Sequence, residues 1–218
     1  RHLCNFFLED EAQVPAWSIE GPRNPEVIEK MVDAYFESDG EIRAMMRALF
    51  TSDQFKQAQF AHVKSPIEFV AGTIQLSGEY RFPDPGLNAL ASATVPMGQH
   101  LMNPPTVEGW HTGKEWIDGG TLVRRINFIA DYVGDVSYPG IQDLVQTLAE
   151  EGPTISPEGL VDGCLRLLGH YELENETRQM LVQHAQKSGE SPTNTREFSK
   201  QVGQMLQMIV ATKEYLYA

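Results

Sequence analysis

The chain has 218 residues, of which 41% are hydrophobic and 22% are charged, so it holds enough apolar material for a substantial core. Its formal net charge of −13 argues against non-specific nucleic-acid binding, which needs a concentrated basic surface, and it disfavours adsorption to anionic lipid. No run approaches the roughly 18 apolar residues of a membrane-spanning helix. We expect residues 1–218 to form a single domain or lobe, with neither a nucleic-acid partner nor a direct membrane span.

The first 60 residues predict the end of one helix and two further helices. Residues 2–9 have the composition of a buried helix end. The run Asn24-Pro25-Glu26 begins the next helix, because Asn suits the N-cap, Pro the first helical position and an acid the first turn. A second apolar face at helical spacing covers residues 42–50. Because the chain starts at Arg1, without Met and inside a helical segment, we expect it to be the C-terminal part of a longer protein.

A capping box marks the start of the next helix, at Ser65-Pro66-Ile67-Glu68. In this motif the serine hydroxyl accepts the backbone N–H of the glutamate, whose carboxylate accepts the backbone N–H of the serine. The predicted helix continues to residue 76. Residues 87–95 form another helix, rich in small side chains that favour close packing.

Residues 104–117, with the sequence PPTVEGWHTGKEWI, interrupt this helical pattern and contain two of the three tryptophans. We expect a non-helical segment that crosses between helices. Within it, Thr112-Gly113-Lys114-Glu115 matches a capping box. Trp116 and Ile117 are therefore predicted on a short helix that Gly119-Gly120 stops. The following helix has its apolar face at Leu122, Ile126, Ile129 and Val133, with Arg124 and Arg125 on its other sides.

The remaining chain also predicts helices. They cover residues 141–148, a helix begun by Ser156-Pro157-Glu158, a polar helix at 172–187, a flexible link at 188–193 and a last helix capped by Asn194-Thr195-Arg196-Glu197. No segment shows the sustained alternation of a strand. The predicted fold class is all-α: an irregular multi-helix bundle with a Pro/Gly/Trp-rich non-helical crossing segment.

One short pattern occurs twice, at residues 49–55 and 209–215. Each copy has an apolar helix end, a small hydroxyl residue, polar residues and an aromatic residue. The two copies indicate a repeated way of closing a helix, and they are too few to predict a solenoid.

Cys4 and Cys164 are the only cysteines, and neither has a CxxC partner, which excludes zinc-ribbon and thioredoxin-like sites. Both lie among apolar residues at helical spacing. This setting favours two buried thiols, and one long-range disulfide is the alternative.

Several separated motifs stand in an order that resembles a known family. They are Leu49-Phe50-Thr51-Ser52, Val63-Lys64-Ser65-Pro66-Ile67-Glu68-Phe69, Gly98-Gln99, Pro104-Pro105, Gly109-Trp110, Trp116-Ile117 and Arg125-Ile126-Asn127-Phe128. The chain resembles the C-terminal half of the bacterial domain-of-unknown-function family 1800. The resemblance implies an α-helical protein, often exported or periplasmic, with a sulfatase-like exported protein as a partner. It implies no activity and no catalytic residue, and His100 and His111 stand where many members have proline.

A binding patch in the crossing segment is the first candidate site. Aromatic rings flanked by carboxylates suit a glycan or peptide ligand, because the rings offer flat apolar area and the carboxylates accept hydrogen bonds. The alternative is that both indoles are buried anchors that hold the crossing segment in place. The candidate binding residues are Trp110, His111, Glu108, Glu115, Trp116 and Arg125.

Other chemistries have weaker support. His100 and His111 could ligate zinc together with Glu108, Glu115 or Asp118, but no HExxH or other regular spacing occurs, and we expect no metal ion and no cofactor. A paired-carboxylate hydrolase could use Glu108 with Glu115 or Asp118, but two acids close in sequence mean little in a chain with 30 acidic residues. A Ser/His/Asp triad lacks its GxSxG elbow. Arg124-Arg125 could bind an anion, or one of them could pair with Glu115 or Asp118.

The predicted function is accordingly broad. We expect a helical scaffold or binding module of an exported bacterial protein. The alternative is a hydrolase or carbohydrate-active enzyme with its site around Trp110 and His111.

Overall fold

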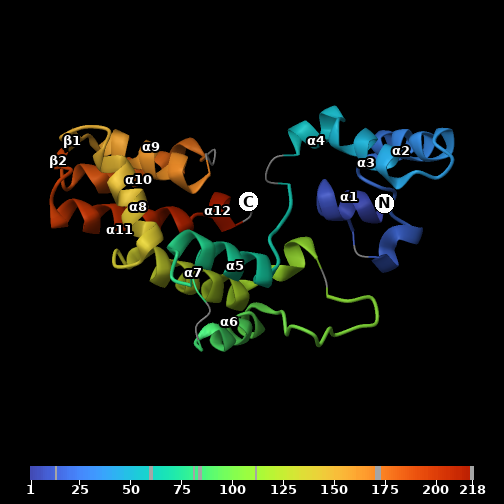
Figure 1. Ribbon diagram of the computed structural model, residues 1–218, viewed down its shortest axis with the longest axis horizontal. Helices are drawn as coiled ribbons and strands as arrows, with labels where there is room; N and C mark the ends of the chain where they lie inside the picture. The colour runs from blue at the N-terminus through green and yellow to red at the C-terminus, as the bar shows by residue number, and fades with distance from the viewer. Residues whose placement is uncertain are drawn as a thin grey trace. The chain divides into compact units, whose positions relative to one another are not determined.

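The computed structural model describes residues 1–12, 14–58, 61–80, 82, 85–110, 112–169 and 173–216 (Figure 1). The chain divides into two compact units. Unit 1 comprises Arg1–Val63 and Pro105–Trp116, and unit 2 comprises Lys64–Pro104 and Ile117–Ala218. Apart from one sheet of two short strands, the regular structure of the described residues is helical, which confirms the all-α class.

Unit 1 contains four α-helices and two short 3-10 helices among its described residues. They are α1 (His2–Phe7), η1 (Val14–Ser18), α2 (Pro25–Glu37), α3 (Ile42–Phe50), α4 (Asp53–Gln57) and η3 (Gly113–Trp116). Helices α2 and α3 pack against each other. The core of this unit is formed by the buried side chains of Cys4, Leu8, Val27, Met31 and Leu49.

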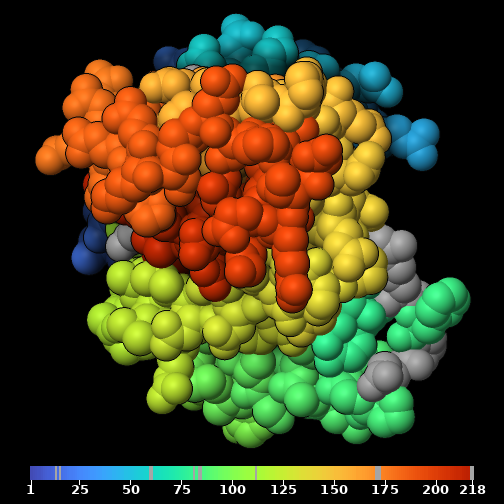
Figure 2. Space-filling view, turned by 90° about the vertical axis from the view of Figure 1, so that its left-hand side faces the viewer, coloured from blue at the N-terminus to red at the C-terminus, as the bar shows by residue number. Residues whose placement is uncertain are grey.

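Unit 2 is larger, and all of its described helices contribute to one core or flank it. They are α5 (Pro66–Ser77), α6 (Leu87–Ala93), η2 (Val95–Met97), α7 (Gly119–Gly134), α8 (Pro139–Ala149), α9 (Pro157–Leu168), α10 (Asn175–Gln186), α11 (Arg196–Val210) and α12 (Lys213–Leu216). Helix α7 lies against α11, and α9 lies against α10. Figure 2 shows the segments from α9 to α11, orange to red, forming one continuous surface with α7.

The apolar face of α11 shows how sequence spacing becomes core packing. Phe198, Val202, Leu206 and Ile209 recur every three or four residues and are fully buried. Burying a side chain of this size contributes about 1.5–3 kcal/mol relative to leaving it exposed. Helix α11 is therefore a main source of stability for unit 2.

Several predicted helix starts are confirmed. Ser65 and Glu68 form the capping box of α5, with both reciprocal hydrogen bonds present. Ser156 caps α9 by accepting the backbone N–H of Gly159 at 3.1 Å. At α11 the N-cap is Thr195, which lies within the predicted run Asn194-Thr195-Arg196-Glu197. Asn24 precedes α2, but its Nδ2 donates to Glu9 Oε1 and its side chain does not cap the helix.

The prediction that Gly119-Gly120 stops a helix is wrong, because these glycines begin α7. Asp118 Oδ1 accepts the backbone N–H groups of Gly120 and Thr121 at 2.6 and 2.9 Å. Thr121 Oγ1 in turn accepts the Asp118 N–H at 2.9 Å, which completes a capping box. The same hydrogen bonds, that of Thr121 first, hold the pKa of Asp118 below its ordinary value.

The predicted flexible link at residues 188–193 contains a strand. β2 (Ser191–Pro192) pairs antiparallel with β1 (Thr154–Ile155), with Thr154 opposite Pro192. Thr193 extends the connection, since its N–H donates to Pro153 O and its Oγ1 to Gly152 O. These bonds tie the link to the start of α9.

Among the described residues, no helix is long and apolar enough to span a bilayer.

Candidate binding site

Unit 1 contains a cavity of about 230 Å³ to which three separate stretches of chain contribute. The stretches are α1, the segment around η1, and the crossing segment that follows Pro105. The described lining residues are His2, Asn5, Ala12, Val14, Trp17, Thr106, Glu108, Gly109, Trp110 and Thr112. Two of the three tryptophans of the chain therefore face one cavity.

A tight turn presents the crossing segment to this cavity. Gly109 N donates to Thr106 O at 3.2 Å, and Thr106 Oγ1 donates to Gly109 O at 2.9 Å. Gly109 has φ +101°, a conformation that residues with a Cβ rarely adopt. The turn thus depends on this glycine, and it fixes the backbone around Glu108, directly before Trp110.

Trp17 is held in place by polar groups at its edge and over its ring. Its Nε1 donates to Ala12 O at 2.6 Å. The guanidinium carbon of Arg1 lies 4.6 Å from the ring centroid, and the His2 ring centroid lies 4.5 Å from it. The indole remains partly exposed, so it is positioned without being wholly covered.

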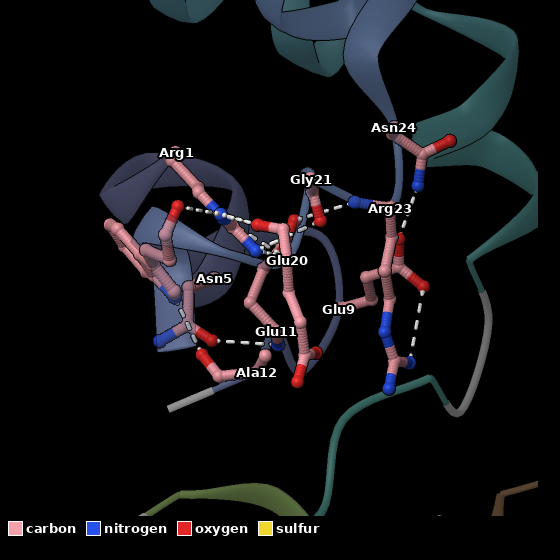
Figure 3. Close-up of polar contacts among 10 residues, drawn as sticks. Arg1, Asn5, Glu9, Glu11, Ala12, Glu20, Gly21, Arg23 and Asn24 are labelled. Atoms are coloured by element: carbon pink, nitrogen blue, oxygen red, sulfur yellow. Dashed lines mark hydrogen bonds and ion pairs between the residues drawn. The ribbon is translucent and has the colours of Figure 1, made fainter. Parts of the chain in front are cut away.

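A buried ion pair supports this arrangement (Figure 3). Arg1 Nε and Nη2 donate to Glu11 Oε2 at 3.1 and 2.9 Å, and the Glu11 side chain is only 1% exposed. Arg1 also donates to the backbone oxygens of Glu20 and Gly21, at 2.7 and 3.0 Å. Because both charges are paired and hydrogen-bonded, the chain leading into η1 is fixed close to the cavity wall.

The same network orients Asn5, which lines the cavity. Its Oδ1 accepts the Glu11 N–H at 2.8 Å. This bond identifies the oxygen of the amide and leaves the Nδ2 group as the donor that Asn5 can offer to a ligand. Glu108 is exposed on the opposite stretch and can only accept hydrogen bonds when ionised. The cavity therefore combines two indoles with an amide donor and a carboxylate acceptor.

The predicted binding residues are distributed over both units. Trp110, which is partly exposed, and Glu108 line the cavity. Glu115 and Trp116 belong to η3, where Glu115 is exposed and Trp116 is buried with 6% of its surface exposed. His111 lies outside the described residues. The buried position of Trp116 is that of an anchor, whereas the position of Trp110 is that of a cavity wall.

Arg125 lies in the core of unit 2, and the prediction that it lies away from the core face of its helix is wrong. Its side chain is fully buried, and Nη1 donates to Lys64 O at 2.9 Å. The guanidinium carbon lies 5.3 Å from the centroid of the Phe69 ring. Burial lowers the pKa of Arg125 to about 10, so it remains charged at neutral pH. Arg125 joins α7 to the start of α5.

Sequence reasoning missed Trp17, His2 and Asn5. The available signal was Trp17, the one tryptophan outside the crossing segment, in a loop that offers few other large apolar residues. Trp17 and Trp110 line the same cavity because distant stretches of the chain meet there, which spacing along the chain does not encode.

The candidate zinc ligands do not form a described cluster. Within the described ranges, no group of three His, Cys, Asp or Glu residues is arranged to hold a metal ion. His100 belongs to unit 2, where its Nδ1 lies 3.3 Å from Asn103 Nδ2. Cys4 and Cys164 are both free thiols in buried positions.

Comparison with known proteins places the chain in a family. A family model described as "Protein of unknown function (DUF1800)" matches residues 1–217. No curated protein and no solved structure matches the chain. Because the family model covers almost all of the sequence, the chain belongs to the DUF1800 family of proteins of unknown function.

Proposed function

We propose that the protein is a binding module and that the unit 1 cavity takes one sugar ring or a similarly small polar ligand with an apolar face. The observation that carries the proposal is the meeting of Trp17 and Trp110 with Asn5 and Glu108 around one cavity. An indole packs well against the C–H face of a sugar, and amide and carboxylate groups bond its hydroxyls.

The size of the cavity supports a small ligand. Its volume of about 230 Å³ lies just below the range of about 300–1,000 Å³ that is usual for small-molecule sites. A single ring or one peptide side chain suits this space better than an extended oligomer. Trp17 is already fixed by Arg1 and Ala12, so little ordering of this wall would accompany binding.

The alternative is a hydrolase or carbohydrate-active enzyme at the same cavity. Glycoside hydrolysis generally uses two carboxyl groups on opposite sides of the scissile bond. Among the described lining residues, Glu108 is the single acid. This observation favours binding over catalysis.

The proposal includes a setting as well as a ligand. From the family resemblance, the module would act in an exported or periplasmic bacterial protein, with a sulfatase-like exported protein as a partner. Such a partner would act on ligands that the binding module retains. A pull-down from periplasmic extract with the wild-type chain and the Trp110→Ala variant would show whether that association exists and whether it depends on the cavity.

The ligand is tested by a glycan and peptide screen followed by calorimetric titration of each hit. Trp110→Ala and Glu108→Gln are expected to weaken binding about tenfold or more, since each removes a direct contact worth about 1.4 kcal/mol. Val107→Ala, at the fully exposed neighbouring position, and Glu29→Gln, on the exposed face of α2, are the matched controls. Circular dichroism verifies that every variant is folded.

Two results would contradict this proposal. If Trp110→Ala unfolds the protein, Trp110 is an anchor and not a binding surface. If both cavity variants stay folded and bind the hits as the controls do, the ligand lies elsewhere.

A further inference from the structure

Helices α2 and α3 form a hairpin in unit 1, joined by residues 38–41, and they lie side by side (Figure 1). The buried side chains of the pair, Val27, Met31 and Leu49, belong to the unit 1 core. Large apolar side chains of the hairpin are also exposed, since 74% of Phe36 and 64% of Ile42 face solvent. Exposed apolar groups of this size on one hairpin are typical of a surface that another protein covers.

Helix α2 repeats one pair of residues every four positions, an apolar residue followed by an acid. The pairs are Ile28-Glu29, Val32-Asp33 and Phe36-Glu37. Ile28 is partly buried and the other five residues are exposed. Because residues four apart lie above one another on a helix, the pattern gives α2 an apolar ridge beside an acidic ridge.

Helix α3 repeats the same arrangement with the opposite charge. Its pairs are Ile42-Arg43 and Met46-Arg47, and Phe50 extends the apolar ridge by one turn. Both arginines are exposed, and 41% of Phe50 faces solvent. Among the described residues, neither arginine pairs with a carboxylate, and none of the three acids in the α2 ridge pairs with a base. The opposite charges of the two helices are therefore not used within the hairpin.

Ridges of residues four apart fit the grooves of a facing helix in the commonest class of helix packing. We propose that α2 of one copy of the chain packs in this way against α3 of a second copy, in a twofold-symmetric dimer. The apolar ridges then meet, and the acids of α2 lie opposite Arg43 and Arg47. Packing α2 on α2 would instead bring acid against acid. Because α2 and α3 are neighbours in one hairpin, a twofold axis makes the contact twice.

The size of this interface sets the strength of the dimer. At 1.5 Å of rise per residue, α2 is about 20 Å long and α3 about 14 Å. Two contacts between such short helices form a small interface beside the roughly 1,600 Å² of a standard one. The net charge of −13 on each copy also opposes association. The dimer should therefore dissociate with a constant on the order of 10 µM.

The test is sedimentation equilibrium of the whole chain between about 1 and 200 µM, a range that brackets this constant. The wild-type chain is expected to pass from monomer to dimer. Phe36→Ser, which removes the most exposed part of the apolar ridge, should weaken dimerisation at least about tenfold. Val123→Ser, at a 53% exposed position on α7, is the matched control and should dimerise as the wild type does.

Charge reversal tests the pairing of α2 with α3. Asp33→Lys/Glu37→Lys and Arg43→Glu/Arg47→Glu should each weaken dimerisation at least about tenfold, because each variant then faces like charge. An equimolar mixture of the two variants restores opposite charges in both contacts. It should therefore form a heterodimer within about threefold of the wild-type affinity. Asp131→Lys/Glu176→Lys, at exposed positions of α7 and α10, changes the net charge equally and should leave dimerisation unchanged.

Four results would overturn the proposal, provided that circular dichroism shows each variant to be folded. They are a wild-type chain that stays monomeric over the whole range, assemblies larger than a dimer, wild-type affinity in Phe36→Ser, and a mixture of the charge-reversed variants that associates no more tightly than either variant alone.

Discussion

The two units differ in how a buried charge is compensated. Glu11 and Arg1 form a buried pair whose charges compensate each other at 2.9 Å. Arg125 is buried and its Nη1 donates to Lys64 O, whereas among the described residues its Nε and Nη2 have no hydrogen-bond partner. Its charge is stabilised instead by the face of Phe69. The Arg1–Glu11 ion pair thus supports the unit 1 cavity. The contact between α5 and α7 is supported instead by the Arg125 cation over the Phe69 ring.

Removing the charge of Glu11 should destabilise unit 1 strongly. Glu11→Gln leaves the Arg1 guanidinium buried without its counter-charge, and breaking such a pair costs about 3 kcal/mol or more. Chemical denaturation monitored by tryptophan fluorescence measures the change. Lys56→Gln, which breaks the exposed pair with Asp53, is the control and should cost less than about 1 kcal/mol. Equal effects of both substitutions would mean that burial of the Arg1–Glu11 pair is unimportant.

Two pairs of consecutive helices, α3 with α4 and α11 with α12, are joined by the same pattern of hydroxyl hydrogen bonds. Ser52 Oγ donates to Leu49 O at 2.7 Å and accepts the Phe55 N–H at 3.1 Å. Thr212 Oγ1 donates to Ile209 O at 2.7 Å and accepts the Tyr215 N–H at 3.4 Å. In each copy the hydroxyl closes one helix and opens the next. The repeated sequence pattern at residues 49–55 and 209–215 therefore has a repeated hydrogen-bond pattern, once in each unit.

Contact between α5 and α8 depends on a residue without a side chain. A Cβ on Gly140 would overlap the backbone oxygen of Leu76, at the end of α5. Gly140→Ala should therefore cost about 1–3 kcal/mol, because the two backbones must move apart. Gly72→Ala, inside α5 with no atom within 4 Å of the added methyl group, should instead stabilise by about 0.5–1 kcal/mol. Thermal unfolding of the two variants compares them directly, and a shift of the same sign in both would contradict this account.

Element starts were predictable where side chain and backbone act locally. The capping box of Ser65 and Glu68 and the cap at Ser156 each involve only residues within one helical turn, and the sequence predicted both helix starts. The prediction for Gly119 and Gly120 was wrong because glycine is common at the ends of helices. Here the capping box of Asp118 and Thr121 instead places both glycines at the start of α7. The strand pair formed by β1 and β2 joins segments far apart in sequence, which local patterns do not reveal.

At the scale of the whole molecule, the two units have separate cores. The sequence predicted the helices that supply these cores, and it located Trp110 and Glu108 in the stretch that lines the unit 1 cavity. It could not predict that Trp17 joins them or that Arg125 is buried in unit 2, because each depends on contacts across many residues. The Arg125–Lys64 hydrogen bond, for example, spans 61 positions.

The two thiols should report separately on the opening of each unit. Cys4 is buried in unit 1 and Cys164 in unit 2. Burial raises the pKa of Cys164 to about 12, so at about pH 8 its native thiol is almost wholly protonated and labelling requires opening. Glu11→Gln should speed the labelling of Cys4, and Gly140→Ala that of Cys164. Mass spectrometry of labelled peptides measures both rates, and parallel changes at both thiols in each variant would show that the units open together.

The division of unit 1 into residues 1–63 and 105–116 has a consequence for biosynthesis. Helices α1 to α4 leave the ribosome before α5 and α6, yet the cavity wall that contains Trp110 is made only after α5 and α6. Unit 1 must therefore remain unfinished while part of unit 2 is synthesised, with the entropy of that intervening loop opposing closure. Its cavity can nevertheless close before α7 to α12 exist. The nascent chain could thus fold unit 1, together with the proposed ligand site, before most of the helices that form the core of unit 2 have been synthesised.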